Sequence, residues 1–110
     1  MQVLLDECLP RKLKRELTGY RVATVPEMGW AGIKNGSLLR LILSSAIDVF
    51  ITIDGNMEYQ QNLPALGVAI IVLSAPDNTI ETLRLLMPKV NQILPTIQHG
   101  EIVHIGSADQ

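Results

Sequence analysis

The sequence predicts an α/β protein, a three-layer α/β/α sandwich with a mainly parallel central sheet of about five strands. Short apolar runs alternate with helix-like patterns along the chain, and this alternation is typical of a parallel sheet with helices on both faces. Apolar residues make up 47% of the 110 residues and aromatic residues only 4%, so we expect a core of Leu, Ile and Val. The length suits one domain, predicted over residues 1–106, with a flexible tail at 107–110.

The first half of the chain contains short apolar runs that predict strands, at residues 3–5, 21–25 and 49–53. Pro10 suits the first turn of a helix, because its missing N–H would have no partner within the helix, and that helix is expected to stop at Gly19. Asn35 is expected to cap a second helix that ends near Ala46. The helices therefore separate the strands, as parallel pairing requires.

The second half repeats this pattern, with two strands around a helical segment. Residues 68–73 are all apolar and predict a strand that is buried on both faces. Asn78 followed by Glu81 fits a capping box, and Pro88 predicts a kink or a restart in the helix that follows. The last strand, 101–105, alternates in polarity and is expected at an edge of the sheet.

Charge and cysteine content limit the classes of protein that this sequence fits. The net charge of −2 argues against a chain that attracts nucleic acid as a whole, although a basic cluster is present at Arg11, Lys12, Lys14 and Arg15. The single cysteine, Cys8, excludes an intramolecular disulfide and agrees with a reducing compartment. No apolar run approaches the length of a membrane span, so we expect a soluble, cytoplasmic protein without membrane contact.

Two aspartates directly follow apolar runs, at the points where predicted strands end. Asp6 follows the first strand and Asp54 follows the third. Ligands bind beyond the carboxyl ends of parallel strands where the strand order reverses, so neighbouring first and third strands would bring these carboxylates together. Carboxylate oxygens suit Mg²⁺ or Mn²⁺, which can activate a water molecule and neutralise charge on a phosphodiester. Aspartates that simply cap the turns after strands are the plainer alternative.

The residues around the first aspartate belong to a wider pattern. The motif D-E-C-L-P at 6–10, followed by a basic helix, resembles the opening D-E-N-L-P of small bacterial PIN-like proteins. The similarity continues in order through VATVPEMGWAG at 22–32, the Leu-rich helix from 37, VFITIDGNMEYQQNL at 49–63 and the apolar strand at 68–73. The resemblance implies a PIN-like fold and a Mg²⁺- or Mn²⁺-dependent endoribonuclease, commonly the toxin of a toxin–antitoxin pair.

The resemblance also implies which acidic residues form the site. Asp6 matches the acid of the family's first strand, and Asp54 matches the acid that ends the later strand, so both are expected to hold the metal ion. Glu7 matches as well, and the expected catalytic set is Asp6, Glu7 and Asp54. RNA is the expected substrate, and the expected protein partners are a cognate antitoxin and a second copy of the chain in a homodimer.

The chain departs from the family pattern near these acids. Asn56 replaces the second acid of the motif D-x-D-F, Asn35 lies where relatives often carry an acid, and Cys8 replaces an asparagine. PIN nucleases generally gather several carboxylates, so these departures leave open a PIN-like module that binds RNA or protein without cutting RNA. Arg11, Lys34 and Asn56 are expected to contact the substrate.

A phosphoacceptor receiver domain is the alternative from another class of protein. Receivers also place acids after the first and third strands, and Ser74 would supply the hydroxyl that follows their fourth strand. However, Pro64 and Gly67 interrupt the short segment between Asp54 and the next strand, which leaves little room for a full crossover helix. The lysine that a receiver carries after its fifth strand is also missing from residues 102–110.

Overall fold

The computed structural model describes residues 1–33, 35–53 and 67–106. Its centre is a sheet of five parallel strands in the order β2-β1-β3-β4-β5. The strands are β1 (Gln2–Leu5), β2 (Arg21–Thr24), β3 (Val49–Thr52), β4 (Ala69–Ser74) and β5 (Ile102–Gly106). The helices are the 3₁₀ helices η1 (Arg11–Glu16) and η2 (Pro26–Met28) and the α-helices α1 (Asn35–Leu43), α2 (Ile80–Arg84) and α3 (Met87–Ile93). The predicted α/β sandwich is confirmed, and so is the edge position of the last strand.

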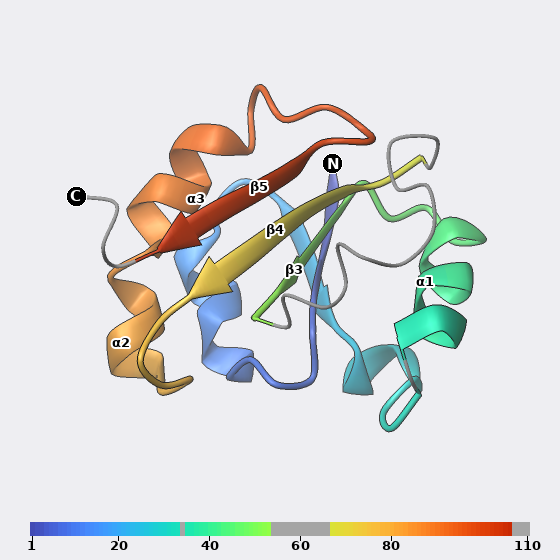
Figure 1. Ribbon diagram of the computed structural model, residues 1–110, viewed down its shortest axis with the longest axis horizontal. Coiled ribbons are helices and arrows are strands. Elements are labelled where there is room, and N and C mark those ends of the chain that lie inside the picture. Colours follow the sequence, from blue (N-terminus) through green and yellow to red (C-terminus); the bar gives the residue numbers. More distant parts are fainter. Residues whose placement is uncertain (34, 54–66, 107–110) are drawn as a thin grey trace.

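Helices cover both faces of the sheet (Figure 1). We call the face covered by η1, α2 and α3 the first face, and the face covered by α1 the second face. Side chains alternate along β1 and β3, so that Leu5 and Ile51 pack on the first face while Leu4 and Phe50 pack on the second. All four side chains are completely buried. Burial on both faces explains why these strands are apolar at nearly every position.

The crossover from β4 to β5 has an unusual hand. The chain passes from β1 to β2 over the first face, and from β2 to β3, in the opposite direction across the sheet, over the second face. These two crossovers differ both in their direction across the sheet and in the face that they cover, and the two differences cancel, so both crossovers have the same hand. From β4 to β5 the chain moves in the β2-to-β3 direction but over the first face, so this crossover has the opposite hand. Nearly all such crossovers are right-handed, and Figure 1 shows that β4-α2-α3-β5 is the left-handed one.

The basic segment after β1 forms a 3₁₀ helix rather than the longer α-helix that its apolar stripe predicts. Leu9, Leu13 and Leu17 are buried on the first face, as the stripe requires, but the helix ends at Glu16. Cationic residues crowd the same few positions of the segment RKLKRE and repel one another along an α-helix. This repulsion disfavours a long regular helix at these residues.

Helix α1 includes the predicted starting residue, Asn35, but ends at Leu43, before the predicted end near Ala46. The hydroxyl groups of Ser44 and Ser45 both donate hydrogen bonds to the carbonyl oxygen of Leu41, at 3.0 and 2.9 Å. Serine side chains compete in this way with the backbone donors of a helix, and this competition favours an early end.

The helical segment after β4 starts one residue later than the capping box predicts. Its N-cap is Thr79, whose hydroxyl accepts a hydrogen bond from the N–H of Thr82 at 3.4 Å. Asn78, the predicted cap, instead donates from its side-chain amide to the carbonyl oxygen of Cys8 at 3.0 Å, and so ties this loop to the loop after β1. Pro88 lies in the first turn of α3, so the predicted restart of the helix is confirmed.

Asp48 joins several segments at the amino-terminal edge of the sheet. Its Oδ2 accepts a hydrogen bond from the N–H of Gln2 at 2.9 Å, and its own N–H donates to the carbonyl oxygen of Gln2 at 2.9 Å. Its carbonyl oxygen accepts from the N–H of Ala69 at 2.9 Å, and Oδ1 lies 3.1 Å from Nε2 of His99. The Gln2 N–H has the largest effect on the pKa of Asp48, and together with His99 it outweighs partial burial and lowers this pKa below its ordinary value.

We expect Leu13→Ala to lower the free energy of unfolding by about 2–5 kcal/mol, because it leaves a cavity in the core of the first face. Leu13 is completely buried, whereas Leu85 is 77% exposed. Leu85→Ala is therefore the matched control and should change the free energy of unfolding by less than about 0.5 kcal/mol. Equal effects of the two substitutions in urea unfolding would contradict the packing of η1 against the sheet.

We expect Asp48→Asn to remove a contribution to stability that depends on pH. The folded pKa of Asp48 lies below its unfolded value, so the ionised form stabilises the fold above about pH 4, and the contribution is lost as the pH falls through the folded pKa. The difference in free energy of unfolding between wild type and variant should therefore be largest near about pH 5 and shrink toward about pH 2. Urea unfolding across this range measures it, and a constant difference would count against the assignment.

Candidate functional site

Asp6 lies at the carboxyl end of the central strand, where the order of the strands reverses. β1 pairs with β2 on one side and with β3 on the other, and the register sets Leu5 opposite Ile51. The N–H of Asp6 donates to the carbonyl oxygen of Ile51 at 3.0 Å and extends this pairing by one residue. The first and third strands are thus neighbours, as the predicted site requires. Ligands of open α/β sheets bind at such a reversal.

The carboxylate of Asp6 is buried and held in one orientation. Asp6 is only 7% exposed, and its Oδ2 accepts a hydrogen bond from Oγ1 of Thr52 at 2.7 Å. Its Oδ1 accepts from the N–H of Glu7 at 2.8 Å. Thr52 ends β3 and is itself completely buried, so the donor is fixed by the sheet. Each carboxylate oxygen has two lone pairs, so both oxygens of Asp6 keep acceptor capacity for a ligand.

Glu7 directs its carboxylate toward the glycine-rich loop that precedes α1. Both of its carboxylate oxygens lie within hydrogen-bond distance of the N–H of Gly32, at 3.1 and 3.2 Å. Gly32 has a φ of +80°, a left-handed conformation that favours glycine. In this arrangement Glu7 connects the loop after β1 to the loop before α1, across the carboxyl edge of the sheet.

Cys8 lies beside the Asp6 carboxylate and is a poor nucleophile. Burial raises the pKa of its thiol, the negative charge of Asp6 adds to this effect, and hydrogen bonding to the backbone of Ile53 only partly opposes it. The thiol therefore stays protonated at neutral pH, and the thiolate is the reactive form. The half-buried side chain also packs against the core of the first face.

The other predicted site residues fall into two groups. Arg11 is exposed at the start of η1, and with Lys12 and Arg15 it forms no salt bridge within the described residues. The fourth cation of this cluster, Lys14, is neutralised by Glu27 at 2.9 Å. The predicted site residues Asp54, Lys34 and Asn56 lie outside the described residues. Within residues 1–33, 35–53 and 67–106, no three His, Cys, Asp or Glu side chains group closely enough to hold a metal ion.

A hollow of about 520 Å³ opens at the carboxyl ends of β3, β4 and β5 and was not predicted from the sequence. Its lining residues are Ile53, Val72, Leu73, Ser74, Ala75, Pro76, Asp77, Asn78 and His104. The sequence does contain a signal for it, because Ser74 ends the apolar run of β4 and Asp77 follows three residues later. His104 joins them only through the pairing of β4 with β5, which no local pattern reveals.

Comparison of the chain with protein-family models, with curated proteins and with solved structures found no match. In the part of the chain that the structure describes, no helix has the length and apolar character needed to cross a membrane. The chemistry of the site therefore has to be argued from the geometry around Asp6.

We expect Thr52→Val to lower the free energy of unfolding by about 1.5–3 kcal/mol, because it removes a hydrogen bond to a buried carboxylate while keeping the shape of the side chain. Thr52→Ser is the matched control, since it keeps the hydroxyl that donates to Asp6 and loses only a methyl group, at a cost of about 1 kcal/mol. Urea unfolding of both variants measures the difference. A serine variant that is less stable than the valine variant would contradict the importance of this hydrogen bond.

Proposed function

We propose that the protein is a Mg²⁺- or Mn²⁺-dependent endoribonuclease and the toxin component of a toxin–antitoxin pair. The observation that carries the proposed chemistry is the buried Asp6 carboxylate, which Thr52 orients at the strand reversal. Aspartates are seldom buried to this extent unless they are paired, and this one has no cationic partner among the described residues. The resemblance to PIN-like proteins supports the nuclease activity and the toxin role.

The donor chemistry around Asp6 fits a hard divalent cation. Both of its oxygens retain lone pairs after accepting hydrogen bonds from the protein, and Mg²⁺ and Mn²⁺ prefer carboxylate oxygens and water. Asp54, the proposed second ligand, follows Thr52 by two positions in the sequence and lies outside the described residues. A bound ion would supply an activated water molecule and neutralise charge on the scissile phosphodiester.

The protein's own residues orient the site and attract the substrate. Thr52 and the N–H of Glu7 hold the Asp6 carboxylate in place before the substrate arrives, so that little reorganisation is needed during the reaction. Beyond its predicted catalytic role, Glu7 holds the loop before α1 at the edge of the site. Arg11 begins η1 just after the Asp6 loop and is proposed to bind a phosphate of the RNA. Lys34 and Asn56 remain predicted substrate contacts.

The strand order favours a second candidate, the phosphoacceptor receiver, because receivers share the order 2-1-3-4-5. The left-handed crossover from β4 to β5 counts against it, since doubly wound receivers follow the right-handed rule. The sequence after β5 also lacks the lysine that the phosphorylation site needs. A PIN-like module that binds RNA or protein without cutting RNA is therefore the stronger alternative, and it differs from the proposed enzyme in its response to metal.

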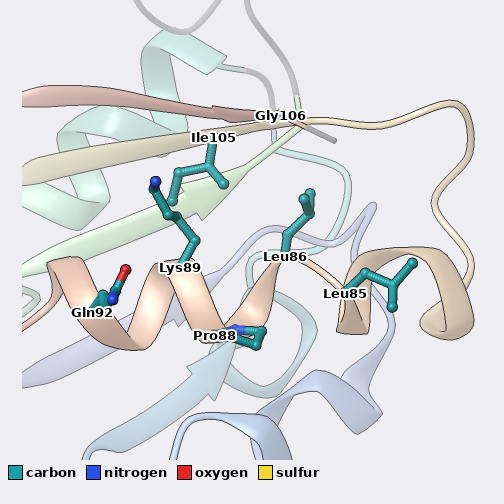
Figure 2. A pocket seen from close by; sticks show the side chains of 7 residues that line it. All are labelled: Leu85, Leu86, Pro88, Lys89, Gln92, Ile105 and Gly106. Carbon is teal, nitrogen blue, oxygen red and sulfur yellow. The ribbon is translucent and has the colours of Figure 1, made fainter. Parts of the chain in front are cut away.

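The proposed protein partners, an antitoxin and a second copy of the chain, have a candidate surface at β5. This strand is an edge of the sheet, and a hollow of about 260 Å³ lies between it and α3. Figure 2 shows Leu86 and Lys89 extending toward Ile105, with Leu85 exposed nearby. An edge strand offers backbone donors and acceptors to a strand of another chain. The cytoplasm is the proposed location for such a pair.

We expect the protein to cut a fluorogenic single-stranded RNA when Mg²⁺ or Mn²⁺ is present, and to lose the activity when the ion is removed with a chelator. Asp6→Asn should lower the metal-dependent rate by at least about 100-fold, because the amide binds a divalent cation far more weakly than the carboxylate does. Initial cleavage rates at saturating metal give the comparison.

Asp48→Asn provides the matched control, because Asp48 lies at the opposite end of the sheet from Asp6 and makes no contact with the Asp6 loop. Its rate should stay within about twofold of wild type while the variant remains folded. Cleavage that persists in Asp6→Asn, or thermal stability and cleavage that do not respond to metal at all, would reject the nuclease and favour the binding module.

A further inference from the structure

The hollow lies at the carboxyl ends of β3, β4 and β5, and the left-handed crossover leaves its second-face side without cover from α2 and α3. In a right-handed crossover, the helices between β4 and β5 would cover the second face, but here α2 and α3 lie on the first face. Val72 points to the second face, and Ser74, two positions along β4, shares its side of the sheet. His104 stands opposite Val72 in the neighbouring strand and completes this wall. The volume of about 520 Å³ falls in the range of ligand-binding sites.

The lining combines apolar contact area with polar groups that have capacity for a ligand. Pro76 and the half-buried Ala75 contribute apolar surface, and the exposed hydroxyl of Ser74 makes no hydrogen bond within the described residues. Thr79 donates its N–H and its hydroxyl to the same oxygen of Asp77, Oδ1, at 3.1 and 2.7 Å. The second carboxylate oxygen of Asp77 can therefore accept hydrogen bonds from a ligand. The bonds from Thr79 also lower the pKa of Asp77, which keeps it ionised.

The hollow is connected to the loop that carries Asp6. Asn78 lines the hollow and donates its side-chain amide to the carbonyl oxygen of Cys8 at 3.0 Å. Cys8 in turn contacts the Asp6 carboxylate through its thiol. A strand of RNA that presents a phosphodiester to Asp6 thus has this hollow beside it, at the same carboxyl edge of the sheet.

We propose that the hollow binds a single unpaired base of the RNA substrate and prefers a base with an exocyclic amine, cytosine or adenine. The amine donates to Asp77, the Ser74 hydroxyl bonds a ring nitrogen or oxygen, and the base lies against Ala75, Pro76 and the imidazole of His104. Proteins recognise single-stranded RNA in this way, through stacking on flat side chains and hydrogen bonds to base edges. The negative charge of Asp77 disfavours a phosphate in the same position. This inference rests on the proposed nuclease function.

Titration of the ¹⁵N-labelled full chain with 5′-CMP, 5′-AMP, 5′-UMP and inorganic phosphate, without metal, tests the base site. We expect CMP and AMP to shift the amide resonances of Ser74, Asp77 and His104, and UMP to bind at least about threefold more weakly because it lacks the amine. Inorganic phosphate should not shift these resonances. The resonances of Lys89 and Gln92, in the hollow of Figure 2, serve as an internal control and should stay unchanged.

Variants of the lining separate recognition from folding. Asp77→Asn keeps an oxygen that can accept the bonds from Thr79 but removes the charge, and it should weaken CMP binding about tenfold. Ser74→Ala changes an exposed hydroxyl and should weaken binding about threefold. Gln92→Ala, in the other hollow, is the control and should leave the affinity unchanged.

The outcomes distinguish failure of this inference from failure of the proposed nuclease. If metal-dependent cleavage occurs but no nucleotide shifts the Ser74 and Asp77 resonances, the base site is rejected and the nuclease stands. Equal shifts from inorganic phosphate, or equal affinity for UMP and CMP in wild type and Asp77→Asn, would also overturn the base site. If CMP and AMP bind as expected while no metal supports cleavage, the base site stands as part of a module that binds RNA without cutting it.

Discussion

The parallel pairing of β1 with β3 is the constraint on which the rest of the structure depends. It places the most apolar part of the chain in the middle of the sheet, where both faces are covered and Leu5 and Ile51 lie side by side. It also reverses the strand order at β1, because β2 lies on one side of β1 and β3 lies on the other. Because of this reversal, the carboxyl end of β1 lies at the point of the sheet edge where open α/β sheets bind their ligands, and Asp6 is the first residue after β1.

Stability and the candidate chemistry meet in the contact between Asp6 and Thr52. A buried carboxylate without a cation is costly unless it is hydrogen-bonded, and the Thr52 hydroxyl and the Glu7 N–H supply those bonds. The same hydrogen bonds fix the orientation of the Asp6 carboxylate, and with it the direction of the lone pairs that remain on its oxygens. Glu7 links the Asp6 loop to the loop at Gly32, and Asn78 links the Asp6 loop to the loop before α2. Three loops at one edge of the sheet are therefore linked around the aspartate by hydrogen bonds, in addition to the apolar contacts that residues such as Cys8 and Trp30 make with the two cores.

The left-handed return from β4 to β5 determines how the two faces are used. It stacks α2 and α3 beside η1 on the first face, where residues of all three helices share one core. The second face has α1 as its only described α-helix, and the hollow at Ser74 and His104 opens at the carboxyl edge on this side. Within the described residues, η1, α2 and α3 therefore pack on the first face, whereas α1 packs on the second.

The sequence by itself determined the class of fold, because unbroken apolar runs such as 68–73 and the stripe of Leu9, Leu13 and Leu17 record how each segment is buried. It also marked Asp6 as a residue at a strand end. The ends of helices were predicted less accurately, because side-chain hydroxyl groups compete there for backbone hydrogen-bonding groups. This competition occurs at Ser44, after α1, and at Thr79, the cap of α2.

Tertiary structure alone decided the strand order, the hand of the last crossover, the partner of Asp6 and the pairing that brings His104 to Ser74. Each of these joins residues that are far apart in the chain, as Asp6 and Thr52 are, which are separated by 46 positions in the sequence. Such contacts are selected by the packing of the whole sheet, so no short stretch of sequence contains them.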